Sequence, residues 1–317
     1  MKVAALSGGV GGAKLLVGLD RALRDDHDRL TAIVNTADDA TIYGVHVSPD
    51  VDIVTYWLAG VADTERGWGM RDDTFTVVTA LEALGEEAWF RLGDRDLGTC
   101  MVRTRRLERG DTLTEATRMI ATAFGLRPTL LPMSDDRVRT TLVTQRGRVL
   151  DFQEYFVKER CEPDVVDVLL SGVEVARPAP GVIEALEGAD IVILCPSNPI
   201  VSTGPILALP GVRDALRRHP LVVAVSPIVG GRALKGPAEK LLRATGTDVS
   251  AQGVAGLYSD LCDVFVIDTT DAGDAAAIED LGVATVVTDT IMTDHDASAA
   301  LARVLLTITA PATPLSL

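Results

Sequence analysis

The chain is short of cysteine, of basic residues and of long apolar runs, and each shortage excludes a class of protein. Its four cysteines stand far apart in 317 residues, with no C-x-x-C pair, which argues against a zinc site and against a disulfide framework. No uncharged apolar run approaches the roughly 18 to 20 residues that a membrane-spanning helix needs. The 30 basic residues are outnumbered by 45 acidic ones, and a formal charge of -15 disfavours nucleic acids and anionic membranes as partners.

Three familiar site patterns are also missing. The four histidines show no metal-ligand spacing. The glycine-rich stretch VAALSGGVGGAKLL, residues 3–16, is not a G-x-G-x-x-G motif, because Lys14 stands where the third glycine would be, and it lacks the Gly-Lys-[Ser/Thr] of a Walker A loop. A Rossmann dinucleotide site and a Walker A site are therefore not supported. The same glycines interrupt the apolar start of the chain, which does not match a signal peptide, and we expect a cytoplasmic protein.

Short apolar runs alternate with helix-like stretches over most of the chain, which is typical of a parallel sheet covered on both faces. The stretch 63–177 breaks this rhythm. We predict an α/β fold: a Rossmann-like, mostly parallel sheet with helices on both faces from residues 1–62 and 178–317, and an inserted α+β cap at 63–177. Strands are expected at 3–6, 31–34, 190–195, 221–226, 264–268 and 285–288, helices at 14–23, 113–124, 206–218, 236–244 and 274–281, and an antiparallel pair at 140–144 and 149–152.

The glycine-rich stretch follows the first expected strand directly. A strand that ends at Leu6, a glycine turn and a helix that starts near Gly12 place several backbone N–H groups at the carboxyl edge of the sheet, which is a physical anion site. Two alternatives stay open. The glycines would also suit a turn chosen only for tight packing, and Lys14 is either a phosphate contact or a solvated helix residue.

Carboxylates follow the second expected strand, in the sequence VNTADDATIYGVHVSPDVD at residues 34–52. Asp38, Asp39, Asp50 and Asp52 then lie near one sheet edge, and such a cluster is costly without a cation. A divalent metal would also let an acidic protein accept a phosphate. The alternatives are proton transfer from a substrate hydroxyl and a solvated acidic loop.

Two later strand ends supply the other wall of the expected site. ILCPSNPIVSTGPIL, residues 193–207, places Ser and Pro before a helix start, and VSPIVGGRALKGPAEK, residues 225–240, repeats the pattern. Free N–H groups at such starts attract anions. With the first glycine loop, these loops would surround a diphosphate, although Gly and Pro also end strands for steric reasons.

Eight segments of the chain together resemble one family. GGVGGAK, NTADD, SPDVD, RGWGMRDDTF, LGDRDLGT, FQEYFV, PSNPIVSTGPIL and SPIVGGRALKGPA, between residue 1 and about residue 260, are similar to the 2-phospho-L-lactate/phosphoenolpyruvate transferase family of coenzyme F420 biosynthesis. The resemblance implies a Mg²⁺-dependent homodimer. It would move a phosphoenolpyruvate or 2-phospho-L-lactate unit from a guanosine diphosphate-linked donor to the terminal ribityl hydroxyl of the deazaflavin Fo. GMP leaves, and dehydro-F420-0 or F420-0 is formed. The composition favours the enolpyruvyl donor.

The same resemblance implies roles for individual residues. Asp38 and Asp39 are expected to bind the metal or to activate the ribityl hydroxyl. Asp52 is expected as a further metal ligand, and Asp50 as a substrate contact. The donor nucleotide and its phosphates are expected at Gly8, Gly9, Gly11, Gly12, Ser197, Asn198, Ser202, Ser226 and Lys235.

A slot for the flat deazaflavin ring is expected in RGWGMRDDTF, residues 66–75. Trp68 offers an aromatic face, and Arg71, Asp72 and Asp73 offer polar edges. The alternative is that Trp68 is a core residue. LGDRD at 92–96 would orient this wall or form an internal ion-pair turn. Relatives carry histidine after this motif where the chain has Cys100, which puts a catalytic role for that position in doubt.

Two other functions compete with the transferase. A nucleotide-sugar-binding regulator of the related glycine-rich α/β group would keep the sheet-edge loops but would need neither the carboxylates nor the aromatic segment. An NAD-dependent oxidoreductase would need the dinucleotide motif that the chain lacks.

Overall fold

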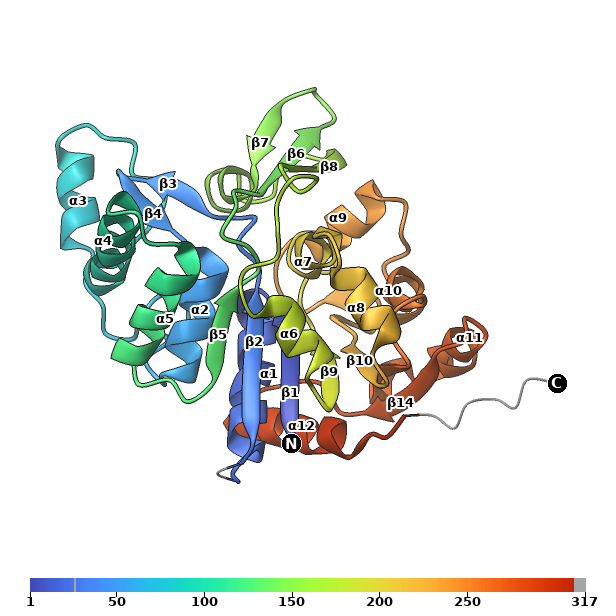
Figure 1. Cartoon of the computed structure of the whole chain (residues 1–317). Coiled ribbons are helices and arrows are strands. Elements are labelled where there is room, and N and C mark those ends of the chain that lie inside the picture. Colours follow the sequence, from blue (N-terminus) through green and yellow to red (C-terminus); the bar gives the residue numbers. More distant parts are fainter. Residues whose placement is uncertain (26, 311–317) are drawn as a thin grey trace.

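The computed structural model describes residues 1–25 and 27–310. Its centre is a parallel sheet in the order β14-β13-β10-β9-β1-β2-β5 (Figure 1). Each strand predicted for the sheet is present, and the parallel arrangement is confirmed. The strands are β1 (Lys2–Ser7), β2 (Arg29–Val34), β5 (Thr129–Pro132), β9 (Ile191–Leu194), β10 (Val222–Val225), β13 (Val264–Asp268) and β14 (Ala284–Thr288).

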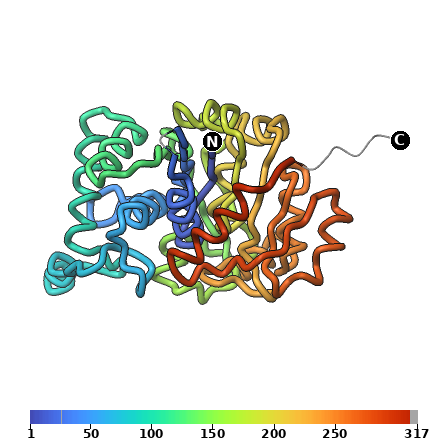
Figure 2. Tube along the Cα trace, turned by 90° about the horizontal axis from the view of Figure 1, so that it is seen from below, coloured from blue at the N-terminus to red at the C-terminus, as the bar shows by residue number. Residues whose placement is uncertain are grey.

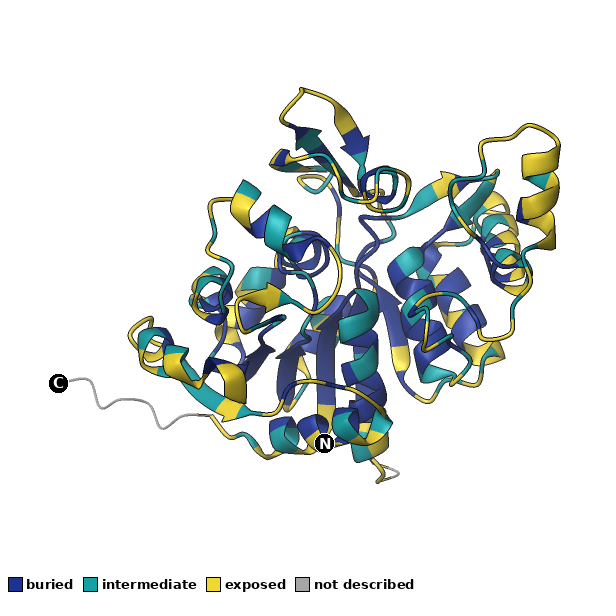
Figure 3. Cartoon of the chain, turned by 180° about the vertical axis from the view of Figure 1, so that it is seen from behind, coloured by how far each residue is buried: buried dark blue, intermediate teal, exposed yellow. Residues whose placement is uncertain are grey.

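Helices cover both faces of this sheet, as predicted, and each face has its own apolar core. The inner strands are buried along almost their whole length (Figure 3), because parallel strands with two covered faces leave no side chain for water. One face packs on α1 (Gly9–Ala22), α2 (Pro49–Leu58) and α12 (His295–Thr307), and the other on α6 (Val182–Glu187), α7 (Thr203–Ala208), α8 (Val212–Arg218), α10 (Ala251–Tyr258) and α11 (Ala275–Glu279).

Helix α12, near the end of the described chain, lies alongside α1 (Figure 2). Gly18 makes this close approach possible. A Cβ at Gly18 would stand 2.2 Å from the backbone oxygen of Ser298, a separation that no side chain tolerates. The two ends of the described chain are thereby joined through the first helix.

Two predicted helices differ from the structure. The first begins at Gly9, not at 14, because the backbone turns into the helix directly after Gly8. The single helix expected at 206–218 is two helices, α7 and α8, because Leu209, Pro210 and Gly211 interrupt it and Gly211 has a φ of +84°. The helix predicted at 113–124 is confirmed as α5 (Leu113–Ala123).

The middle of the chain forms two lobes that flank the carboxyl edge of the sheet (Figure 1). A helical lobe has a core of its own, and a three-stranded antiparallel sheet in the order β7-β6-β8 packs on Val201 and Leu241. The antiparallel pair predicted at 140–144 and 149–152 is confirmed. The elements are β3 (Ala40–Ile42), β4 (Val45–Val47), α3 (Thr76–Ala83), α4 (Asp94–Glu108), α5, β6 (Arg139–Thr144), β7 (Val149–Asp151), η1 (Glu154–Lys158) and β8 (Val165–Ser171).

The predicted division of the chain needs a correction at β5. This strand lies inside the stretch 63–177 that was assigned to a cap, yet it pairs with β2 at the edge of the central sheet. It is short and ends at Pro132, so its pattern is weak in the sequence. Residues 311–317 of the predicted core lie outside the described residues. The remaining elements are β11 (Ile228–Val229), β12 (Arg232–Ala233), α9 (Ala238–Ala244) and η2 (Thr269–Asp274).

Candidate active site

The strand order reverses between β1 and β9. After β1 the chain builds the sheet outward through β2 and β5, and it then returns to add β9 on the other side of β1. Ligands of open α/β sheets bind at such a point, beyond the carboxyl ends of the strands. The loops that follow β1 and β9 touch here: the Gly8 N–H donates to Ser197 Oγ at 3.0 Å, and Ser197 Oγ donates to the Gly8 carbonyl at 2.8 Å.

Close packing explains part of the glycine-rich loop. A Cβ at Gly12 would lie 2.3 Å from Ser7 Oγ and 2.7 Å from Ser197 Oγ, and a Cβ at Gly11 would lie 2.5 Å from the Pro196 carbonyl oxygen. Both positions therefore require glycine whether or not a ligand binds. Tight packing, which the sequence analysis left open as an alternative, therefore explains these two glycines. It does not exclude an anion site, because the backbone amides at the start of α1 are still present.

Asp50 occupies part of the expected anion site. The Gly9 N–H, at the start of α1, donates to Asp50 Oδ1 at 2.8 Å, and Asn35 Nδ2 donates to Asp50 Oδ2 at 2.9 Å. Burial raises the pKa of Asp50 to about 6, and the bonds from Asn35 and Gly9 oppose that rise. The first helix amide thus holds a carboxylate of the protein, and the other amides of the first turn have no partner inside the helix.

Asp38 lies beside Asp50 and is buried, with 6% of its surface exposed. Burial raises its pKa well above the ordinary value, and the neighbouring Asp50 charge raises it further. Asp38 Oδ1 makes no hydrogen bond of good geometry among the described residues, although the side chains of Asn35 and Thr140 lie close enough to the carboxylate to oppose the rise in its pKa. Since a buried carboxylate oxygen without a partner is costly, this atom marks a place for a ligand.

Asp39 is held by two side chains that the sequence analysis missed. Ser48 Oγ donates to Asp39 Oδ1 at 2.7 Å, and His46 Nε2 lies 2.9 Å from Asp39 Oδ2. Burial raises the pKa of Asp39, and the contact with His46 opposes the rise. The β3–β4 hairpin causes this arrangement, since Ala40 pairs with Val47 and the strand returns beside Asp39. The signal in the sequence was the turn Tyr43-Gly44, which has positive φ at both residues.

Asp38 and Asp50 offer carboxylate oxygens to a divalent cation. The charges of Asp50 and Asp39 raise the pKa of Asp38, and the charge of Asp39 raises that of Asp50, so a cation beside them would remove that repulsion. The ligand atoms of Asp38, Asp39 and Asp50 do not all lie within 4.8 Å of one another; among the described residues, Asp52, Asp96 and Cys100 form the group that meets this distance. Carboxylate oxygens are the ligands that Mg²⁺ prefers. The orphaned Oδ1 of Asp38 is the strongest sign that these residues are arranged for a group other than protein.

Asp52 does not join this cluster, contrary to the prediction. Two positions along a helix lie about 200° apart around its axis, so Asp50 and Asp52 point away from each other on α2. Arg103 of α4 holds the Asp52 carboxylate instead, with Nη1 3.0 Å from Oδ2 and Nη2 against Oδ1. Both side chains are buried, and the guanidinium is the cation that balances Asp52.

The pair Asp52–Arg103 is the centre of a buried polar network. Tyr56 donates to Asp96 Oδ1 at 2.6 Å, and Cys100 Sγ lies 3.9 Å from Asp52 Oδ2. Burial raises the pKa of the Cys100 thiol, and the Asp52 charge raises it further, so this thiol stays protonated. Ligand atoms of Asp52, Asp96 and Cys100 all lie within 4.8 Å of one another, but the Asp52 carboxylate is already paired with Arg103. Cys100 therefore belongs to this network and not to the carboxylate cluster.

Asp96 makes stability depend on pH. Burial raises its pKa to about 7 from an ordinary value of 3.8, and the Asp52 charge adds to the rise. The folded protein thus binds this proton more tightly than the unfolded chain. The contribution of protonated Asp96 to the free energy of unfolding is full below about pH 4 and is lost as the pH rises through 7. We expect Asp96→Asn, which stays neutral, to be more stable than the parent at pH 8 by about 2–4 kcal/mol.

Denaturant unfolding at pH 5 and pH 8 measures this effect. The difference between the two pH values should shrink in Asp96→Asn, while Asp280→Asn, at the exposed end of α11, should behave like the parent. Equal pH dependence in Asp96→Asn and the parent would contradict the assignment.

The residues predicted to hold the donor are only partly brought together. Ser197 and Ser202 lie against Gly8. Asn198 Oδ1 accepts from the amides of residues 200 and 201, so it shapes the loop. Ser226 uses its hydroxyl in its own turn, where it donates to the Ile228 carbonyl and accepts from the Ile228 amide. The Ser226 hydroxyl is thus used within the protein, and its contact with the donor stays a prediction.

Two lysines stand near the start of α1. Lys235 Nζ lies 2.6 Å from the position that a Cβ on Gly67 would take. Lys14 Nζ donates to the Met292 carbonyl at 2.7 Å, and burial lowers its pKa, with the charge of Lys235 adding to the effect. Lys14 is therefore half-buried and not a solvated helix residue, and it faces a second cation beside the glycine loop.

The residues of segment 66–75, which was predicted to bind the deazaflavin ring, differ in their surroundings. Trp68 is 38% exposed and packs on Phe75 and Arg66. Asp73 accepts from the amides of Arg95 and Asp96 and so caps the start of α4. Asp73 thus has a structural role at the start of α4, and its contact with the ring stays a prediction. Asp94, the first residue of α4, likewise accepts from the amides of residues 76 and 77, so hydrogen bonds and not ion pairs tie LGDRD to the neighbouring segment. Arg71 and Asp72 are exposed.

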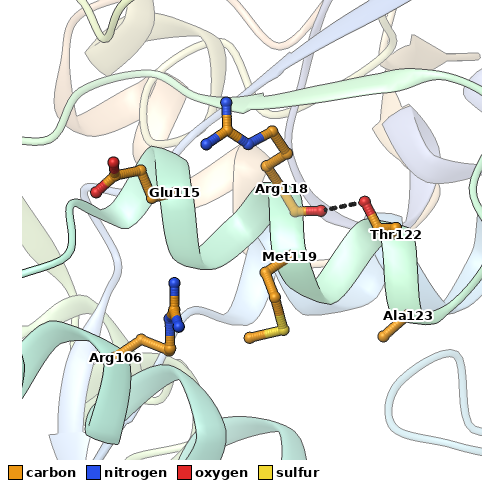
Figure 4. A pocket seen from close by; sticks show the side chains of 6 residues that line it. All are labelled: Arg106, Glu115, Arg118, Met119, Thr122 and Ala123. Atoms are coloured by element: carbon orange, nitrogen blue, oxygen red, sulfur yellow. Dashed lines mark hydrogen bonds between the residues drawn. The ribbon is translucent and has the colours of Figure 1, made fainter.

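The structure has one pocket beside the carboxylates and a larger hollow away from them. A pocket of about 170 Å³ adjoins the carboxylates and is lined by Asp38, Asp39, Arg137, Thr140, Phe152 and Gln153, among others. A larger hollow of about 450 Å³ lies between α4 and α5 and is lined by Arg106, Glu115 and Met119 among others (Figure 4). The larger hollow contains none of the residues predicted for the site.

Comparisons with known proteins identify the family of the chain. The family model described as 2-phospho-L-lactate transferase CofD matches residues 3–305. A phosphoenolpyruvate transferase of Kitasatospora aureofaciens is 41% identical over 97% of this chain and 98% of its own length. A 2-phospho-L-lactate transferase of Methanosarcina mazei is 42% identical over 94% of this chain and 97% of its own length.

A solved structure has the same fold. A Bacillus halodurans protein of the UPF0052 family superimposes with a TM-score of 0.65 over 96% of this chain and 98% of its own, at 16% identity. That likeness shows the fold alone. Within the described residues, no helix is both long and apolar enough to cross a membrane. With a family model that covers nearly the whole chain and relatives above 40% identity, the chain belongs to the 2-phospho-L-lactate transferase CofD family.

Proposed function

We propose that the chain is a Mg²⁺-dependent transferase of phosphoenolpyruvate or 2-phospho-L-lactate. The donor would be linked to guanosine diphosphate, and the acceptor would be the terminal ribityl hydroxyl of Fo. The observation that supports this most directly is the orphaned Asp38 Oδ1 beside Asp39 and Asp50, at the point where the glycine loop meets the Ser197 loop. Neither a regulator nor an NAD enzyme needs this carboxylate cluster.

The reaction is a displacement at the distal phosphorus of the donor. The ribityl oxygen forms a bond to that phosphorus, and the bond from phosphorus to the oxygen shared with GMP breaks, so that GMP leaves with this oxygen. The hydroxyl proton passes to a carboxylate of the pair Asp38–Asp39. Mg²⁺ held by Asp38, Asp39 and Asp50 would offset the negative charge of the phosphates.

The protein positions these groups through its own contacts. Ser48 and His46 hold Asp39 in one orientation, and the Gly9 amide and Asn35 hold Asp50. Lys14 and Lys235, with the remaining amides of the first turn of α1, would attract the donor phosphates. The exposed face of Trp68 would take the deazaflavin ring. The homodimer and the cytoplasmic location stay predictions.

A product assay tests the proposal. Protein, Fo and MgCl₂ are incubated with the enolpyruvyl donor and, separately, the lactyl donor, and the products are read by mass. We expect GMP and dehydro-F420-0 or F420-0 to appear, and excess EDTA to abolish them. No product from either donor would refute the transferase, and full activity in EDTA would refute the Mg²⁺ role. Titration of Fo fluorescence separates the alternatives, since neither a regulator nor an NAD enzyme should bind Fo tightly.

A further inference from the structure

The pocket of about 170 Å³ beside the carboxylates has no role in the site described so far. A water molecule takes about 30 Å³ of liquid, so the pocket has room for roughly six non-hydrogen atoms. That is the size of a three-carbon acid with its ester oxygen, and it is far smaller than a three-ring deazaflavin or a guanine nucleoside. The pocket therefore suits the smallest part of the two substrates.

Polar groups in this pocket lack hydrogen bonds of good geometry to the protein. Thr140 Oγ1 is buried and forms no such bond, although it lies close enough to the Asp38 carboxylate to lower its pKa. Gln153 is only 6% exposed, and its side-chain amide has no hydrogen bond to any described residue. Both side chains come from the small antiparallel sheet and the segment that follows β7. Buried polar groups are normally paired, so the Thr140 hydroxyl points to a ligand, and Gln153 lines the same pocket with its amide unpaired.

The charges at the pocket favour an anion. Arg139 is paired with Asp151 on the neighbouring strand, whereas Arg137 is in no ion pair with a described residue. With a divalent cation on the carboxylates, the guanidinium of Arg137 remains uncompensated. Guanidinium, hydroxyl and amide groups are suitable donors for a carboxylate. A neutral polyol would use the hydroxyl and the amide but would leave the cation unpaired.

The reaction geometry requires a place for such an acid. The incoming hydroxyl and the departing GMP oxygen lie on opposite sides of the reacting phosphorus. The ester oxygen that carries the three-carbon acid must leave in a third direction. Asp38 stands beside Asp50, which holds the first amide of α1, and Asp38 also lines the pocket. A phosphoryl group at Asp38 thus has this pocket next to it.

We infer that this pocket binds the three-carbon acid of the donor, whose carboxylate accepts hydrogen bonds from Arg137, Thr140 and Gln153. Phe152, which is buried and lines the pocket, would contact the methyl or methylene carbon. The inference rests on the proposed transferase function and deepens it. It makes Arg137, Thr140 and Gln153 the residues that distinguish a complete donor from a plain guanosine diphosphate.

Steady-state kinetics with the complete donor, and inhibition by GDP, test this assignment. GDP lacks the acid, so its inhibition constant should not change in Arg137→Met, Thr140→Val or Gln153→Leu. The kcat/KM for the donor should fall about 10- to 100-fold in each variant, as for the loss of a hydrogen bond to a charged group. The KM for Fo should stay constant, and Arg137→Lys should recover part of the loss. Arg146→Met, on the exposed turn of the same small sheet, is the matched control.

Three results would overturn the assignment. A rise in the KM for Fo would place the acceptor in the pocket. An equal loss of GDP affinity would place the nucleotide there, and unchanged kinetics would leave the pocket without a role. An inactive parent protein with both donors would instead refute the proposed function itself. Arg137 is exposed, so its variants test the inference even where a buried substitution at Thr140 impairs folding, which thermal melting would show.

Discussion

Asp38→Asn is expected to reduce kcat on the order of 10³-fold, comparable to the loss of a group that stabilises developing charge, and to stabilise the fold when no divalent cation is present. Activity falls because an amide neither holds a cation nor accepts a proton as a carboxylate does. Stability rises because the substitution removes a buried charge that Asp50 repels. The two effects have opposite signs, which a simple folding defect cannot produce.

The measurements are turnover with saturating Fo and donor, and thermal melting with and without MgCl₂. The parent should melt at higher temperature with Mg²⁺, because a cation that binds only the folded state stabilises it, and Asp38→Asn should not respond. Asp280→Asn, with an exposed carboxylate directly after α11, should match the parent in both assays. Parent-like turnover in Asp38→Asn would remove Asp38 from the mechanism.

Arg103→Met is expected to have the largest effect on stability, a loss of about 3–5 kcal/mol, because it leaves the buried Asp52 carboxylate without its cation. Arg103 also donates to the His46 carbonyl at 3.2 Å, so its removal loosens the hairpin that orients Asp39. We therefore expect weaker Mg²⁺ binding as well. Denaturant unfolding measures the stability, and the Mg²⁺ dependence of turnover measures the second effect.

A double substitution separates the lost ion pair from lost packing. Arg103→Met with Asp52→Asn removes both charges, and we expect it to recover a large part of the stability lost in Arg103→Met alone. Arg105→Met, on the exposed side of the same helix, should change stability by less than about 0.5 kcal/mol. Strictly additive effects of the two buried substitutions would show that Asp52 and Arg103 are not energetically coupled.

Much of the fold follows from local patterns. The apolar runs at β1, β9, β10 and β13 predict buried parallel strands, because side chains covered on both faces leave few polar positions. Strand β5 escaped prediction since it is short and ends at a proline. The break between α7 and α8 depended on Pro210 and Gly211, whose effect on an otherwise helical pattern was underestimated.

Some residues of the candidate site could likewise be identified from the sequence, and others could not. Asp38 and Asp39 could be identified because they follow a strand directly. Asp50 and Asp52 looked equivalent in the sequence, but the turn of α2 sends Asp50 to the Gly9 amide and Asp52 to Arg103. His46 could not be identified from spacing, because its contact with Asp39 depends on the pairing of β3 with β4.

The amino-acid sequence by itself determined the α/β class, the glycine loop after β1 and the carboxylates after β2, because hydrophobic periodicity and strand-end chemistry act over a few residues. The tertiary structure decided which of those carboxylates share a site, which glycines serve packing, and which buried polar groups lack partners. These depend on contacts between residues far apart in the chain, such as Gly8 with Ser197. Such contacts form only when the whole core packs.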